Sequence, residues 1–178
     1  MHAYNLLVVC INSPLHYALY DDDRLLESFH IDEKPSRALP LMYQHLQESS
    51  VRVGGIYYAS GPGNLSALKL THIFLQSWAI VESIPLYATD SFSLCLDSHI
   101  PAFGKKYFTL QNCSQIPYIL ESTFEPNTKA TNLAIAQAHI THTLCPTPRE
   151  RQPFLAPQIL PKQRFCLPCE PLYILPPL

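Results

Sequence analysis

The sequence predicts an α/β protein, and three observations carry that prediction. Short apolar runs rich in β-branched and aromatic residues recur along its first half, separated by turn signals such as Asn12-Ser13-Pro14. Two longer segments place apolar residues at helical spacing. Hydrophobic residues make up 47% of the 178 residues and charged residues only 15%, so the chain has enough apolar material for a packed core.

The first three strands are expected to form an antiparallel meander. Residues 5–11, 16–20 and 25–31 are strand-like runs, and short turn signals separate them. Asn12-Ser13-Pro14 supplies the first turn, and Asp21-Asp22-Asp23 supplies the second. Connections this short join neighbouring antiparallel strands.

A helix is predicted over residues 36–48. Ser36 is its expected N-cap, because a serine hydroxyl can accept a hydrogen bond from a free N–H of the first turn. Pro40 falls near the end of that turn, where its missing N–H costs least. Four apolar residues recur at helical spacing: Leu39, Met42, Tyr43 and Leu46.

A strand, a long helix, a short strand and a third helix follow. Residues 53–59 read as a buried strand, which ends at the loop Ser60-Gly61-Pro62-Gly63-Asn64. A helix is expected over 65–83 and a strand over 86–88, with Thr89 or Asp90 capping a third helix. Three antiparallel strands feeding this βαβα unit predict a ribonuclease-H-like lobe, as in actin and the sugar kinases, over residues 1–100.

The rest of the chain, residues 101–178, is predicted to form a reduced second lobe with an extended proline-rich C-terminal arm. Residues 106–111 are expected to form a strand and residues 129–143 a helix. From Leu144 to the end, 9 of 35 residues are proline, a density that no helix tolerates. Residues 172–175 are a candidate edge strand within the arm.

Charge and hydropathy exclude some function classes. The net charge is −2 and there is no basic run, which argues against a large surface that binds nucleic acid directly. No apolar run reaches the length of a membrane span, and the N-terminus lacks the features of a secretion signal. We therefore expect a cytoplasmic protein whose six cysteines stay reduced.

The Gly-Pro-Gly loop is a candidate anion or nucleotide site. Gly61, Gly63 and Asn64 precede a helix N-terminus, where free N–H groups attract anions, and Asn12 and Ser13 follow the first strand. The alternative is a tight strand-to-helix turn capped by Asn64, which we favour because the loop contains no phosphate-binding lysine.

The long helix has two apolar stripes, which indicates burial on two sides. One stripe contains Ala67, Leu70, Thr71, Phe74, Trp78 and Val81, and the other contains Leu65, Leu68, His72, Leu75 and Ala79. Either the second lobe covers the helix, or one stripe is a subunit interface shared with the 36–48 helix. The interface hypothesis comprises Leu39, Met42, Tyr43, Leu46, Ala67, Leu70, Thr71, Phe74 and Trp78.

We predict no metal site and no catalytic residue. His139, His142 and Cys145 are close in sequence but no carboxylate joins them, and Cys166 and Cys169 have no second cysteine pair nearby. No nucleophile is accompanied by the general base and orienting group that catalysis needs.

Several stretches resemble the TsaB (YeaZ-like) family of bacterial tRNA threonylcarbamoyladenosine biosynthesis proteins. Residues 61–69 are similar to the family's signature, a Gly-Pro-Gly loop followed by Ser-Phe-Thr-Gly-Leu-Arg. The other similar stretches, in order, are residues 6–28, 36–40, 84–86 with 90–92, and 170–174. The resemblance covers residues 5–95 and the last few residues of the chain.

Departures from the family pattern mark this chain as a diverged, shortened member. Asn12 stands where the family has an aspartate that helps to position metal and phosphate in active relatives. Ala67, Lys69 and Thr71 replace a glycine, an arginine and a second glycine of the signature. The resemblance therefore implies a subunit without catalytic activity of its own.

The resemblance also implies partners. The chain would be a scaffold that binds a TsaD-type transferase, which holds the metal and transfers threonylcarbamoyl to the adenosine next to the anticodon of ANN-decoding tRNAs. A TsaE-type ATPase would join this complex, and a TsaC-type synthase would supply threonylcarbamoyl-adenylate. Contact with tRNA would be indirect. No cofactor is expected, ATP or ADP would bind only at the complex interface, and the lone chain is a candidate homodimer.

Two other functions remain as alternatives. The first is a stand-alone, nucleotide-binding phosphotransferase of the sugar-kinase type, against which Asn12 and the missing phosphate lysine both count. The second is a peptidase, which no metal motif or nucleophile supports.

Overall fold

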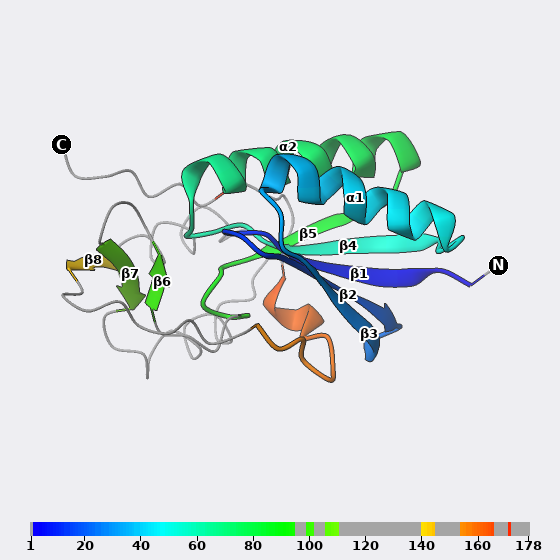
Figure 1. Cartoon of the computed structure of the whole chain (residues 1–178). Coiled ribbons are helices and arrows are strands. Elements are labelled where there is room, and N and C mark those ends of the chain that lie inside the picture. Colours follow the sequence, from blue (N-terminus) through cyan, green and yellow to red (C-terminus); the bar gives the residue numbers. More distant parts are fainter. Residues whose placement is uncertain are drawn as a thin grey trace.

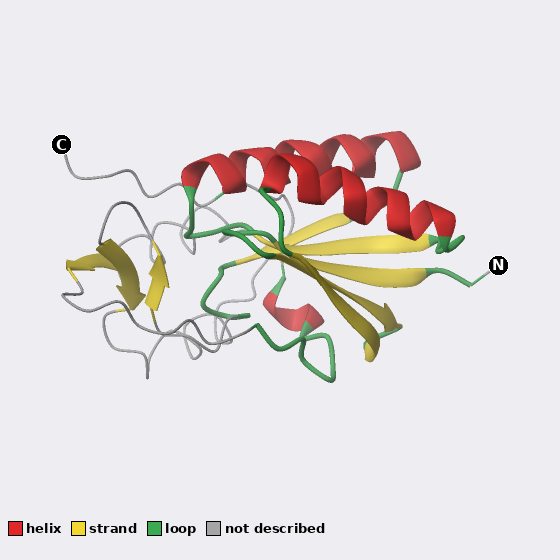
Figure 2. Cartoon of the chain, in the orientation of Figure 1, coloured by secondary structure: helices red, strands yellow, loops and turns green. Residues whose placement is uncertain are grey.

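The computed structural model of the chain describes residues 2–94, 99–101, 106–110, 140–144, 154–165 and 171. In this part of the chain, a five-stranded mixed sheet has two helices on one face and residues 154–165 on the other (Figures 1 and 2). A separate three-stranded sheet contains β6 (His99–Pro101), β7 (Lys106–Leu110) and β8 (Ile140–Leu144). None of the described helices is long and apolar enough to cross a membrane.

The large sheet has the strand order β3-β2-β1-β4-β5. Its strands are β1 (Tyr4–Val9), β2 (Leu15–Asp21), β3 (Arg24–Ile31), β4 (Val53–Ala59) and β5 (Leu86–Thr89). The first three strands form the predicted antiparallel meander, and β4 has the predicted bounds. Because β1, β4 and β5 are parallel, their carboxyl ends meet at one end of the sheet.

The central strand β1 is apolar on both faces. Leu6 and Val8 belong to the core under the helices, while Leu7 and Val9 belong to a second core on the opposite face. All four side chains are buried. A strand with this pattern needs cover on both sides.

Helix α1 (Pro35–Glu48) begins one residue earlier than predicted. Pro35 occupies the first turn and Lys34 is the N-cap, with no side-chain cap bond, so the prediction of a Ser36 cap is wrong. The fixed φ of proline suits this first helical position and favours the earlier start. Pro40 then lies inside the helix, beyond the first turn where we had placed it, and its side chain is exposed.

Each helix is joined to the sheet by a tyrosine–histidine hydrogen bond. The Tyr17 hydroxyl on β2 lies 2.6 Å from Nδ1 of His45 on α1. The Tyr58 hydroxyl on β4 lies 2.8 Å from Nδ1 of His72 on α2 (Leu65–Glu82). These bonds keep the two hydroxyl groups paired where the tyrosine rings enter the core.

Two predicted helices differ from the structure, and one strand was not predicted. Residues 140–143 were predicted to end a helix, but they lie in strand β8, where Ile140, Thr141 and Thr143 are β-branched. No helix begins at residues 91–94, which form a turn after β5. Strand β6 was not predicted. The candidate edge strand at 172–175 and most of the 129–143 helix lie outside the described residues, and the boundary between the lobes stays a prediction.

Residues 154–165, here called the C-terminal strap, cover the second face of the large sheet. Leu160 and Phe165 are the buried residues of the strap, and the Phe165 ring packs edge-on against Tyr57 of β4 at 5.1 Å. The strap contains one short 3₁₀ helix, η1 (Lys162–Arg164). It thus takes the place that a helix has on the other face.

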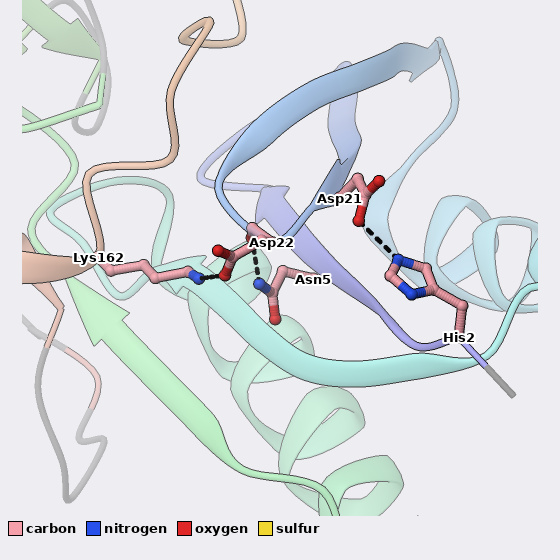
Figure 3. Close-up of polar contacts among 5 residues, drawn as sticks. All are labelled: His2, Asn5, Asp21, Asp22 and Lys162. Atoms are coloured by element: carbon pink, nitrogen blue, oxygen red, sulfur yellow. Dashed lines mark hydrogen bonds and ion pairs between the residues drawn. The ribbon is translucent and has the colours of Figure 1, made fainter.

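The strap is held at the turn between β2 and β3 (Figure 3). The Lys162 ammonium group contacts the Asp22 carboxylate, and the N–H of Leu160 donates to the carbonyl of Asp23 at 2.7 Å. The same turn binds the start of the chain, because His2 contacts Asp21 at 2.6 Å and the Asn5 amide donates to the Asp22 carbonyl. One turn therefore joins the N-terminal strand to the C-terminal strap.

If the strap is part of the core, truncating its buried residues will destabilise the protein. We expect Leu160→Ala and Phe165→Ala each to lower the free energy of unfolding by about 2–4 kcal/mol. Ile159→Ala is the matched control, because Ile159 is 67% exposed and its truncation should cost less than about 0.5 kcal/mol. Urea denaturation measures all three. Equal effects at positions 159 and 160 would show that the strap does not pack in solution.

Candidate functional site

The Gly-Pro-Gly loop lies at the carboxyl end of β4, between the ends of β1 and β5. A Cβ on Gly63 would lie 2.7 Å from the Ile11 carbonyl oxygen and 2.8 Å from its Cβ, so only glycine fits there. Gly61 has a φ of 130°, a conformation that favours glycine. The loop therefore packs tightly on the residue that follows β1.

Several hydrogen-bonding groups at the end of this loop and the start of α2 are used within the fold. The Asn64 side chain accepts from the N–H groups of Ser66 and Ala67, at 3.0 and 3.1 Å, and the Asn64 N–H donates to Ile11. The N–H of Leu68 donates to the Asn64 carbonyl. Three of the four N–H groups that open the helix thus have partners, which supports the alternative of a capped turn.

Asn12 and Ser13 are likewise engaged. The Asn12 side-chain oxygen Oδ1 accepts from the Ser13 N–H at 3.0 Å, and the Ser13 hydroxyl donates to the backbone carbonyl of Glu33 at 3.1 Å. Ser13 thereby ties the loop after β1 to the segment that leads into α1. The structure brings the five candidate anion-site residues to the same end of the sheet, but their polar groups mainly bind the chain itself.

Two polar residues next to this loop were not singled out as site residues by the sequence. Desolvation raises the pKa of the Asp90 carboxyl, and hydrogen bonds from the hydroxyl and N–H of Ser93 offset part of that rise. The Ser91 hydroxyl is fully buried and has no partner among the described residues, although its N–H donates to the Gly61 carbonyl at 2.7 Å. Neither residue was signalled by the sequence, because the raised pKa of Asp90 and the lack of a partner for the Ser91 hydroxyl among the described residues both result from burial.

The candidate metal ligands form no site among the described residues. No group of three histidine, cysteine, aspartate or glutamate side chains is placed to hold a metal ion in that part of the chain. His142 lies in strand β8 rather than in a helix. His139, Cys145, Cys166 and Cys169 lie outside the described residues.

Cys10 is buried, and it does not have the surroundings of a nucleophile. Burial raises the pKa of its thiol to about 11, so the thiol stays protonated near neutral pH. The Thr71 hydroxyl donates to the Cys10 carbonyl at 3.2 Å, which ties α2 to the end of β1.

Most of the nine residues of the interface hypothesis lie in the chain's own core. Six are buried: Leu39, Met42, Leu46, Ala67, Thr71 and Trp78. Tyr43 and Phe74 are half-buried, and their rings meet edge to face between α1 and α2 at 6.4 Å. Leu70, 42% exposed, is the member that faces solvent. Most of the set therefore packs α1 and α2 against the sheet and against each other.

A different apolar surface runs along α2. Ile73, Ile80 and Val81 are 62%, 67% and 81% exposed, and they share one face of the helix with Leu70 and the exposed Ser77. We call these five residues the exposed α2 face. Neither predicted stripe contained Ile73 or Ile80. Their spacing of seven residues, which brings two residues to the same side of a helix, was the available signal.

If Asn64 serves as a helix cap, removing its side chain should destabilise α2. We expect Asn64→Ala to lower the free energy of unfolding by about 1 kcal/mol, because two N–H groups lose their cap. Ser66→Ala is the matched control, since the exposed Ser66 side chain does not cap the helix. Thermal denaturation compares the two variants. A larger loss for Ser66→Ala would contradict this account of the loop.

Two solved structures from Pseudomonas aeruginosa are similar to this chain. YeaZ aligns with a TM-score of 0.50 and 19% sequence identity, over 62% of this chain and 62% of that chain. An uncharacterized protein with similarity to the peptidase YeaZ gives the same TM-score and identity, over 62% of this chain and 61% of that one. This chain thus matches less than two thirds of either length. Its sequence matches no protein-family profile and no curated protein.

The fold similarity agrees with the sequence resemblance. The aligned structures are YeaZ and a protein with similarity to YeaZ, and YeaZ-like proteins are the family that the Gly-Pro-Gly loop and its neighbouring stretches suggested. At this identity the similarity concerns the fold alone. This chain, with its five-stranded mixed sheet and two helices on one face, has a YeaZ-like fold.

Proposed function

We propose that this chain is a non-catalytic scaffold subunit of a bacterial, cytoplasmic tRNA threonylcarbamoylation complex, and that it binds a TsaD-type transferase. The observation that carries the proposal is the exposed α2 face. Four large apolar side chains on one side of a helix are costly to leave in water and are typical of a protein-binding surface. The YeaZ-like fold supports the choice of partner. In this proposal the five-stranded lobe is ribonuclease-H-like, the C-terminal arm is proline-rich, and no cofactor is bound.

The shape of this face suits a helical partner surface. From Leu70 to Val81 the stripe rises about 17 Å along α2. Ser77 lies between its larger residues, and its small side chain lets a facing helix approach closely. Tyr43 and Phe74 are half-buried between α1 and α2. They would therefore lie at the border of the interface with the partner, not at its centre. The same face is the surface through which the lone chain would form a homodimer.

The absence of a catalytic role rests on the surroundings of the candidate groups. Asn12 carries no charge, the Cys10 thiol is held protonated, and three of the four N–H groups that open α2 after the Gly-Pro-Gly loop bind the protein itself. These features argue against the alternatives of a sugar-kinase-like phosphotransferase and a peptidase. The transferase and a TsaE-type ATPase would supply the chemistry, and tRNA would reach the complex without direct contact to this chain.

A charge placed at the centre of the exposed α2 face should abolish binding to the transferase. We expect Ile73→Asp to weaken the affinity by more than about 100-fold, because the carboxylate would be buried without a partner. Unfolding of the lone variant should change by less than about 0.5 kcal/mol, since Ile73 is 62% exposed. Isothermal titration calorimetry with a purified TsaD-type transferase measures the first effect, and urea denaturation measures the second.

Leu155→Asp is the matched control for this experiment. Leu155 is 64% exposed but belongs to the strap, on the opposite face of the sheet, so this variant should bind normally. If Ile73→Asp folds and still binds, the face is not the interface. If neither the wild type nor the control binds the transferase, the scaffold function itself is wrong.

The isolated chain should not turn over nucleotide or peptide. We expect no magnesium-dependent hydrolysis of ATP above background, and no rise in melting temperature on adding ATP or ADP, because three of the four N–H groups that open α2 already have partners. A coupled phosphate-release assay and thermal-shift measurements check both outcomes. Turnover that is lost in Asn12→Ala would favour the phosphotransferase alternative.

A further inference from the structure

The outer edge of β3 is a second feature that the proposed scaffold role leaves unused. β3 is the terminal strand of the large sheet, and the strap pairs with it only at its first residue, where Arg24 bridges Ile159. The N–H of Leu25 donates to the Gln158 carbonyl at 3.0 Å. Within the described part of the chain, the outward backbone groups from Leu26 to Ile31 have no further partner.

Six residues of open edge provide a template for another strand. They extend about 20 Å, the length of an average strand. Edges of this kind bind extended peptides through main-chain hydrogen bonds. The strap contact shows that the edge accepts an antiparallel segment, because the Arg24–Ile159 bridge is antiparallel. The side chain of Leu26, 53% exposed, adds apolar surface at the start of the open stretch.

The charge around this edge is strongly acidic. Six of the chain's 14 acidic residues lie between positions 21 and 33, where the only basic residue is Arg24. Asp21, Asp22 and Glu33 have partners in His2, Lys162 and Arg37. Within the described residues, the remaining three acids of this stretch, Asp23, Glu27 and Asp32, form no ion pair, and all three are exposed.

We infer that the outer edge of β3 binds an extended, basic segment of another protein as a sixth, antiparallel strand. The acidic side chains would pair with lysine or arginine of the partner, while the main chain supplies the hydrogen bonds. A second copy of this chain does not fit. Antiparallel pairing of β3 with itself would bring residues 21–23 of one copy beside residues 32–33 of the other, and both groups are acidic.

The test uses the full chain and three synthetic peptides of about eight residues. One alternates lysine with valine, one alternates glutamate with valine, and one is the lysine peptide with proline at two central positions. We expect micromolar binding of the first alone, measured by fluorescence anisotropy. Amide hydrogen exchange at residues 26–31 should slow when this peptide binds. Equal binding of the acidic or the proline peptide would overturn the proposal, as would no binding at all.

Charge-reversal variants locate the site. Glu27→Lys should weaken binding of the lysine peptide about fivefold at low salt, the scale of an exposed ion pair. Glu82→Lys makes the same change on α2 and should bind as the wild type. If Glu27→Lys fails to fold, Asp32→Lys serves as the edge variant in the same binding test. Equal affinity of the edge variant and the control for the lysine peptide would overturn the proposal. So would outward amides of residues 26–31 that are already protected from hydrogen exchange in the free chain. Loss of self-association in Glu27→Lys would also overturn it, because a second copy of the chain would then occupy the edge.

Discussion

The central strand β1 sets the constraint on which the rest of this structure depends. Its side chains are apolar on both faces, so the sheet is stable only if both faces are covered. α1 and α2 cover one face, and the strap covers the other although its prolines prevent it from forming a long helix. The close contact of Gly63 with Ile11 fixes where α2 starts relative to the end of β1.

The sequence predicted the elements whose signals are local. β4 has its predicted bounds because an apolar run ends at a glycine–proline loop. Asn64 caps α2 as predicted, because its side-chain oxygen can accept from the N–H groups of the first turn. The start of α1 was missed because Pro35 is a stronger local signal than the Ser36 hydroxyl. The strap is a non-local feature, because its place under the sheet depends on contacts across more than a hundred residues, such as Tyr20 with the Pro157 carbonyl.

The candidate site was harder to predict, because a helix with two apolar stripes does not specify which of them faces the sheet. Residues from both predicted stripes, including Thr71 and Leu75, are buried on the sheet. The exposed α2 face contains Ile73 and Ile80, which neither stripe included. Which residues are exposed depends on how α2 packs against the sheet and against α1. These are tertiary properties that the helical period does not encode.

The turn at residues 21–23 holds segments from the two ends of the described chain, and this has a consequence during synthesis. Residues 4–89, which form the large sheet and its two helices, leave the ribosome before residues 154–165 do. Until then Leu7, Val9 and Tyr57 have no strap over them, so the nascent chain presents an apolar sheet face. Contacts so distant in sequence form slowly. Covering of this face is therefore a late step in folding, because it must wait until residues 154–165 have been synthesised.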